Sequence, residues 1–233
     1  MGFQLLLNTM FSRMIDLIKL VPIISYLRSR SYSQFWEDRL IARNLSTEIG
    51  SYVDIGAGAP IWGSNTYLFY KKGWAGVTVD PVAFNMKMQK LFRPRDRRYE
   101  SVVSSSSEIV EFYQLSPWEL STLDSAIARE RISNGSVLIK KHSIKPISLD
   151  RIYRENPIKR PAILSIDVEG AEFEVLKSNN WETNKPDIIC IEELKNPLDT
   201  SEVREFLSLQ DYELGAYNGV SSIYIWRGSE HIA

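Results

Sequence analysis

Short apolar runs alternate with amphipathic stretches along most of the chain. Runs of the kind that form buried strands occupy residues 51–56, 74–81, 97–105 and 187–194. A further run begins at 162 and turns directly into a helical pattern that continues to 179, and other helices are expected at 64–73, 82–92 and 201–209. Two alternating segments, 212–217 and 221–226, flank the turn-forming pair Asn218–Gly219. This order predicts an α/β fold with a doubly wound, mostly parallel seven-stranded sheet and a C-terminal antiparallel hairpin.

The middle of the chain departs from this rhythm. Residues 107–136 are polar and irregular, and residues 137–153 look like an extended segment that leads into a short helix. In doubly wound sheets, ligands bind beyond the carboxyl ends of the strands, where the winding reverses. The polar residues that follow the predicted strands are therefore the candidates for a site.

Composition narrows the class of protein. The chain has 233 residues, 44% hydrophobic and 24% charged, which suits one large domain. Its net charge of −1 gives no basic excess, so we expect no nucleic-acid partner. The single cysteine, Cys190, lies in an apolar run and is expected to be a buried thiol. These features fit a cytoplasmic protein, and they leave the oligomeric state open.

The N-terminal residues 1–30 form a segment of their own, ahead of a domain that spans 31–233. Arg13, Asp16 and Lys19 interrupt the apolar stretch, so no charge-free run is long enough to span a bilayer. Two interpretations stay open. Residues 1–27 form either a helix packed on the domain or an amphipathic helix in peripheral contact with the inner face of a membrane.

The glycine-rich turn at 53–60 predicts a cofactor site. Gly56 and Gly58 match the start of a dinucleotide-binding turn, but Ile61 stands where that fingerprint has its third glycine. Asp54, just before the turn, instead suits a cofactor with a charged amino-acid portion. Asp80, at the end of the second strand, is placed to accept both hydroxyls of a ribose. Together they favour S-adenosylmethionine, and an NAD(P)-linked oxidoreductase is the alternative.

Three stretches resemble the FkbM-type methyltransferases. Residues 53–81 look like that family's first two strands, "SIDVEGAEFEVLKS" at 165–178 resembles its second signature, and "SYSQFWEDRL" at 31–40 resembles its N-terminal one. The resemblance covers about residue 31 to the end, and implies a class I S-adenosylmethionine-dependent methyltransferase fold with N-terminal helices. It also implies O-methylation, often of sugars in polysaccharide pathways. Trp36 departs from the family, which usually has glycine there, and Ala57-Gly58-Ala59 replaces a more polar run.

These arguments give a set of expected site residues. The cofactor contacts are expected from Gln34, Asp38, Asp54, Gly56, Ala57, Gly58, Asn65, Asp80, Pro81 and Ser104. The methyl acceptor is expected to be a small molecule or a glycan, and Trp62 and Trp118 are candidates to stack on a sugar ring.

Methyl transfer to a hydroxyl requires a group that removes a proton. Asp167, at the end of a central strand, is the first candidate, and His142, between polar neighbours on a predicted strand, is the second. Asp167, Glu192 and Glu193 end adjacent strands, so they also offer oxygen ligands to Mg²⁺ or Mn²⁺. Alternatively, Asp167 only caps the helix that follows. A non-catalytic module with the same fold is the third functional interpretation.

Overall fold

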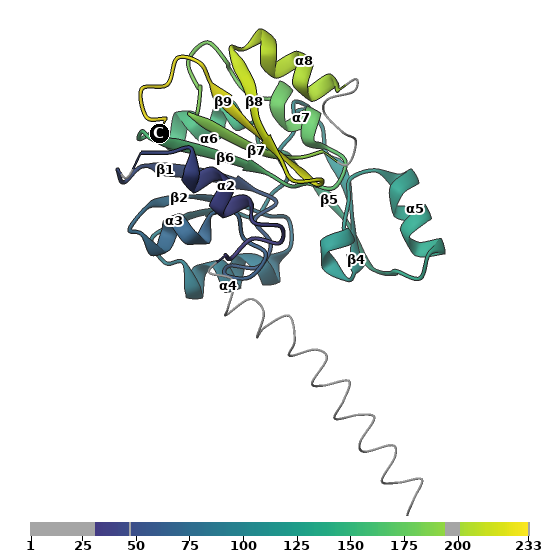
Figure 1. Ribbon diagram of the computed structural model, residues 1–233. Helices are drawn as coiled ribbons and strands as arrows, with labels where there is room; N and C mark the ends of the chain where they lie inside the picture. Colours follow the sequence, from purple (N-terminus) through teal and green to yellow (C-terminus); the bar gives the residue numbers. More distant parts are fainter. Residues whose placement is uncertain (1–30, 47, 194–200, 233) are drawn as a thin grey trace, which may run out of the picture.

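A seven-stranded sheet organises the molecule in the computed structural model, which describes residues 31–46, 48–193 and 201–232 (Figure 1). The strands of this sheet are β1 (Ser51–Ile55), β2 (Ala75–Val79), β3 (Arg97–Tyr99), β6 (Ala162–Ile166), β7 (Ile188–Glu192), β8 (Tyr212–Tyr217) and β9 (Ser221–Trp226). The helices around it are α2 (Glu37–Arg43), α3 (Tyr67–Lys71), α4 (Ala83–Phe92), α6 (Leu149–Glu155), α7 (Glu172–Lys177) and α8 (Glu202–Leu209). The expected segment 1–30 lies outside the described residues.

The strand order is β3-β2-β1-β6-β7-β9-β8. Neighbouring strands from β3 to β7 are parallel, and β9 is antiparallel to both β7 and β8. The chain winds outward from β1 in one direction and from β6 in the other, so the winding reverses between these two strands. The predicted doubly wound sheet and its C-terminal hairpin are confirmed.

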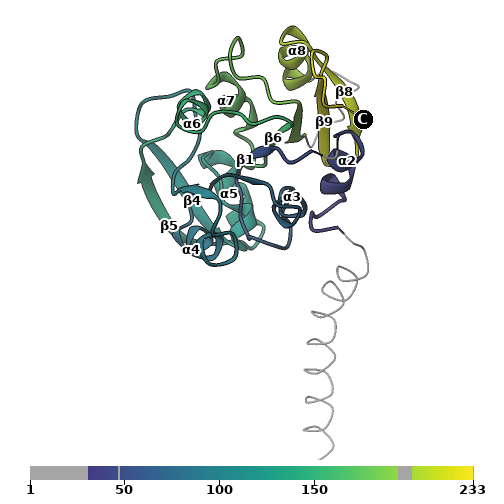
Figure 2. The same cartoon turned by 90° about the vertical axis from the view of Figure 1, so that its left-hand side faces the viewer.

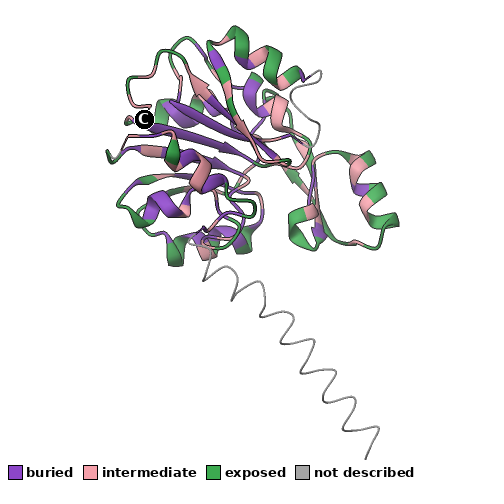
Figure 3. Cartoon of the chain, viewed as in Figure 1, coloured by how far each residue is buried: buried purple, intermediate pink, exposed green. Residues whose placement is uncertain are grey.

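Alternation along β1 shows how the sheet is buried on both faces (Figure 3). Val53 and Ile55 pack in one apolar cluster, together with residues of α6, α7 and α8. Tyr52 points to the opposite face and packs with α2 and α3. Since successive side chains of a strand face opposite sides, Asp54 shares the face of Tyr52. The direction of the Asp54 side chain therefore determines which residues it can contact.

β1 and β6 approach closely at both ends. A Cβ atom on Gly50 would lie 1.7 Å from the carbonyl oxygen of Pro161, and one on Gly56 would lie 1.7 Å from that of Asp167. The first carbonyl accepts a hydrogen bond from Ser51 N at 3.0 Å. Glycine is therefore required on both sides of β1.

The third strand is shorter than the sequence suggests. The apolar run predicted a strand over 97–105, whereas β3 ends at Tyr99. Beyond it, Ile147 N donates to Val102 O at 3.0 Å and Ser104 N donates to Ile147 O at 3.2 Å. Residues 102–104 thus pair with the segment before α6 and no longer pair with β2.

The irregular middle of the sequence forms an ordered excursion from the sheet. It consists of β4 (Val110–Ser116), the 3₁₀ helix η1 (Trp118–Leu120), α5 (Ser125–Ser133) and β5 (Val137–Ile144). β4 and β5 form a separate two-stranded antiparallel sheet, and α5 projects beside it (Figures 1 and 2). The extended segment and short helix expected over 137–153 correspond to β5 and α6. Polar caps and turns explain why apolar periodicity did not reveal β4 and α5. No helix in the described part of the chain has both the length and the apolar composition to cross a membrane.

Candidate functional site

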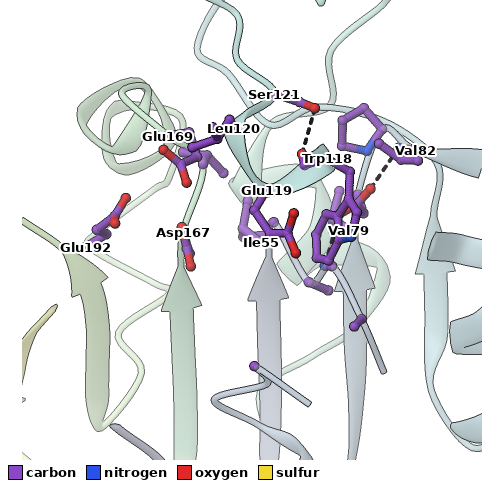
Figure 4. Close-up of a pocket in the computed structure, with 18 of the residues that line it drawn as sticks. Ile55, Val79, Val82, Trp118, Glu119, Leu120, Ser121, Asp167, Glu169 and Glu192 are labelled. Carbon is purple, nitrogen blue, oxygen red and sulfur yellow. Dashed lines mark hydrogen bonds between the residues drawn. The ribbon is translucent and has the colours of Figure 1, made fainter. Parts of the chain in front are cut away.

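A cavity of about 910 Å³ lies at the carboxyl ends of the central strands. Figure 4 shows Asp167 and Glu192 at the tips of neighbouring strands, Glu169 above them, and Trp118 over the strands that carry Ile55 and Val79. The excursion contributes Phe112 and the segment around η1, and the N-terminal motif contributes Gln34, Phe35 and Glu37. The cavity therefore occupies the position where the winding of the sheet reverses.

The glycine-rich turn lines the part of the cavity next to β1. Gly56 has a φ of 76° and Gly58 a φ of 49°, both in the left-handed region that favours glycine. Gly56 N and Ala57 N both donate to Val79 O, at 2.9 and 3.1 Å, which fixes the turn to β2. The turn and its three residues line the cavity as expected.

Asp80 joins the turn to the end of β2. Its carboxylate accepts hydrogen bonds from Gly58 N at 2.9 Å, Val82 N at 2.7 Å and Asn85 Nδ2 at 3.1 Å. Burial raises the pKa of Asp80 to about 6, although these hydrogen bonds oppose the shift. Asp80 also lines the cavity, so its oxygens are held in place for a further donor.

Gln89 is a supporting residue that the sequence did not reveal. Its Nε2 donates to the carbonyl oxygens of Ala57, at 3.3 Å, and Gly58, at 3.1 Å. Gln89 lies one helical turn after Asn85 on the buried side of α4. The signal available in the sequence was a pair of amide residues, Asn85 and Gln89, one turn apart in an otherwise amphipathic helix.

Asp54 has different partners from the ones expected. The structure places it outside the cavity lining, on the sheet face that it shares with Tyr52. Its carboxylate accepts from Thr66 Oγ1 at 2.5 Å and lies 3.7 Å from Arg93 Nη1. Arg93 is fully buried and also binds Asp96 at 2.7 Å. We refer to Asp54, Arg93 and Asp96 as the buried ion network.

Three acids meet on the other side of the cavity. Carboxylate oxygens of Asp167, Glu169 and Glu192 all lie within 4.8 Å of one another, and we call these residues the acid cluster. Arg131 binds Glu169 at 2.6 Å. Desolvation by the surrounding protein, then Glu192 and Glu169, hold the pKa of Asp167 well above its usual range, although its side chain is open to the cavity.

The other acids of this edge behave differently from one another. Desolvation, followed by Glu169 and Glu172, raises the pKa of Glu192 to about 7. Glu193, expected beside Glu192 as a metal ligand, does not line the cavity. Its carboxylate binds the hydroxyl of Ser201 and that of Tyr224, the latter at 2.8 Å. Glu169 thus takes the place in the cluster that the sequence assigned to Glu193.

The N-terminal motif contributes through two of its polar residues. Gln34 and Glu37 line the cavity, and Glu37 accepts from Phe35 N and Asn218 Nδ2, both at 2.8 Å. Asp38 is fully buried and instead holds its own segment, since it accepts from Ser31 Oγ at 2.6 Å and from Tyr32 N at 2.8 Å. Sequence reasoning named Asp38 among the cofactor contacts, whereas Glu37 is the acid of this motif that lines the cavity.

Trp36 occupies a conformation that favours glycine. Its φ is 72°, directly before α2, and just over half of its surface is exposed. A bulky residue in the left-handed region is strained. This geometry gives a physical reason for the glycine that FkbM-type sequences usually have here.

The remaining expected residues divide into two groups. Asn65, Pro81, Trp62 and Trp118 line the cavity. Ser104 and His142 do not; Ser104 Oγ accepts from Ser106 N, and His142 lies on β5 with Nε2 at 3.0 Å from Gln114 Oε1. Desolvation and then Lys140 lower the pKa of His142, which favours a neutral ring.

The strand order and the cavity at the reversal of winding define a class I methyltransferase-like α/β domain. A family model, described as the methyltransferase FkbM domain, matches residues 54–214. The match spans most of the chain, and the chain belongs to this family of methyltransferases. None of the curated proteins matches it.

Proposed function

We propose that the protein is an S-adenosylmethionine-dependent O-methyltransferase that acts on a hydroxyl group of a sugar or glycan precursor. One observation carries the proposal: a single cavity joins Asp80 and the glycine-rich turn to Asp167 on the other side of β1. One end is suited to hold a nucleoside, and the other to accept a proton.

The donor set near the turn fits S-adenosylmethionine. Asp80 has three donors from the protein, and its two carboxylate oxygens retain acceptor capacity for ribose hydroxyls. Gly56 and Gly58 allow the main chain to approach the cofactor closely. The acid cluster and Glu37 supply negative charge for the cofactor's cationic end. The bound cofactor supplies an activated methyl group.

Asp167 is the proposed base. Its raised pKa makes the carboxylate a stronger proton acceptor than an ordinary aspartate, and it is open to the cavity. The proton of the acceptor hydroxyl would pass to this carboxylate as the oxygen gains the methyl group. Trp62, which is about half exposed at the cavity, offers an aromatic face to a sugar ring.

A divalent cation is the alternative partner of the acid cluster. Oxygen atoms of Asp167, Glu169 and Glu192 are the ligand type that Mg²⁺ and Mn²⁺ prefer. In that arrangement Asp167 would orient the acceptor through the ion. Exhaustive chelation of the parent protein, followed by an assay of methyl transfer to nucleotide sugars and oligosaccharides, separates the two mechanisms. Unchanged transfer excludes the ion and leaves Asp167 as the candidate base, which loss of transfer in Asp167→Asn would then support. Loss of transfer on chelation that Mg²⁺ restores assigns the ion.

Calorimetric titration tests the cofactor. S-adenosylmethionine should bind and NAD(P) should not, and Asp80→Asn should weaken binding by about 10- to 100-fold, because a charge-assisted hydrogen bond contributes roughly 1.5–3 kcal/mol. The affinity of the parent should also fall below pH 6, where Asp80 becomes protonated. Asp211→Asn, at an exposed acid away from the cavity, is the matched control. NAD(P) binding in place of S-adenosylmethionine would establish the oxidoreductase alternative.

A further inference from the structure

The outer face of α4 carries large apolar side chains in solvent. Phe84 is 67% exposed and Leu91 is 65% exposed. They are seven residues apart, so they lie on the same side of the helix. The opposite side carries the buried residues Asn85, Met86 and Gln89. The helix thus supports the cofactor turn with one face and leaves an apolar stripe on the other.

Lysines border this stripe. Lys87 and Lys90 are exposed, and neither has an ion pair among the described residues. α4 itself, "AFNMKMQKLF", contains no acidic residue. A helix with an apolar stripe and uncompensated lysines beside it is typical of one that lies on an anionic lipid surface.

The apolar surface continues onto β5. Ile139 is 56% exposed and lines a groove that it shares with Phe84 and Trp118. Val137, two residues earlier on the same side of the strand, is 58% exposed. We call Phe84, Lys87, Lys90, Leu91, Val137 and Ile139 the α4–β5 surface. Among the described residues, Glu119 is the one acidic residue that lines the groove.

The sequence that precedes the described domain has a composition similar to that of this surface. The 30 residues that precede Ser31 have an apolar sequence with four basic residues and one acidic residue. The segment before the described domain therefore has a sequence of the same apolar and basic character as the α4–β5 surface.

We propose that the α4–β5 surface docks on an anionic lipid bilayer, with the apolar side chains in the interface and the lysines at lipid phosphates. A second copy of the chain is a poorer occupant, since a symmetric dimer through this face would bring like charges of Lys87 and Lys90 together. Trp118 lines both the groove and the main cavity. Docking would therefore place the cavity beside the bilayer. The inference is independent of the proposed cofactor and acceptor.

Flotation of the full chain with lipid vesicles is the test. We expect binding to vesicles that contain phosphatidylglycerol and little binding to pure phosphatidylcholine. Phe84→Glu with Leu91→Glu should lower partitioning more than 10-fold. Lys87→Gln with Lys90→Gln should lower it about 30-fold, at roughly 1 kcal/mol for each lysine. Leu209→Glu, at an 81% exposed leucine on α8, is the matched control and should bind as the parent does.

An introduced thiol gives a second measurement. Because the native Cys190 is 1% exposed, a dye should react selectively with a cysteine placed at Leu91. Its emission should shift to the blue on anionic vesicles, and the same dye at Leu209→Cys should not shift. The proposal is overturned if the parent does not bind anionic vesicles, or if the double glutamate variant binds as the parent does. Concentration-dependent dimerisation abolished by Phe84→Glu with Leu91→Glu would assign the surface to a second copy instead.

Discussion

Two acids at the ends of neighbouring central strands have opposite surroundings. Asp54, on β1, lies in the buried ion network, where Arg93 and Thr66 oppose the increase in pKa that burial causes. Asp167, just after β6, lies in the acid cluster, where desolvation and each neighbouring carboxylate raise its pKa. Asp54 therefore has a cationic partner within the protein. Asp167 has only carboxylates as charged neighbours in the cluster, so it is available to bind a proton or an external cation. The comparison separates an acid that maintains the fold from one available for chemistry.

Removing the cation of the buried ion network should have the largest effect. Arg93→Met leaves Asp54 and Asp96 without their counterion, and the free energy of unfolding should fall by about 3–5 kcal/mol. The loss of the ring contacts with Tyr52 and Tyr70 adds to this. Urea unfolding measures the change.

The matched control is the same substitution at Arg131, the arginine that binds Glu169 of the acid cluster. Arg131 and Glu169 are partly exposed, so Arg131→Met should lower the free energy of unfolding by less than about 1 kcal/mol. Equal losses in the two variants would show that the two regions do not differ in charge matching.

Neutralising a member of the acid cluster should instead raise the free energy of unfolding. The pKa of Glu192 is raised to about 7 from an ordinary value of 4.5, so between these values the folded protein binds more protons than the unfolded chain. Stability from this group is therefore lost as the pH rises from 4.5 to 7. Glu192→Gln should be more stable than the parent by about 1–3 kcal/mol at pH 8, and nearly equal to it at pH 4.5.

Urea unfolding at the two pH values checks this sign. Asp54→Asn is the comparison variant, because it leaves the buried Arg93 with one carboxylate fewer, and it should lose stability at both pH values. If Glu192→Gln lost stability at pH 8, the charge of Glu192 would be compensated in the folded protein.

Apart from the Arg131→Met control, the smallest effect concerns an acid of the excursion whose carboxylate accepts hydrogen bonds from the main chain. Asp124 Oδ1 accepts from Ala126 N at 2.6 Å and Ile127 N at 3.1 Å, at the start of α5. Asp124→Ala should lower the free energy of unfolding by about 1 kcal/mol. Thermal unfolding at pH 6 and pH 8 would detect it. A gain in stability would show that the Asp124 carboxylate, like that of Glu192, lowers the stability of the folded protein.

The sequence predicted which strand ends carry the site, because apolar runs and a glycine turn mark those ends locally. Asp80, Gly56 and Gly58 therefore lie at the cavity as expected. The direction of each side chain was harder to predict. Asp54 faces Arg93 because it alternates with Val53 and Ile55, and nothing near position 54 indicates a partner at position 93.

The same limitation explains the acids after β6 and β7. Glu192 and Glu193 are adjacent in sequence, yet one faces the cavity and the other binds Tyr224 on β9. Glu169 joins the cluster through a φ of 58°, a turn geometry that its sequence position does not reveal. Within the excursion, β4 and α5 were missed as regular structure, because α5 depends on a polar cap and β4 pairs with β5 rather than with the main sheet.

The close approach of β1 and β6 limits how the length of this chain can change in evolution. Gly50 and Gly56 are six residues apart, and so are Pro161 and Asp167, the residues whose carbonyl groups they meet. Inserting or deleting one residue in either strand would shift a side chain into a space that holds only a hydrogen atom. Insertions should therefore accumulate in the excursion and the surface loops, whereas the spacing from Gly50 to Gly56 should stay constant among descendants of this sequence.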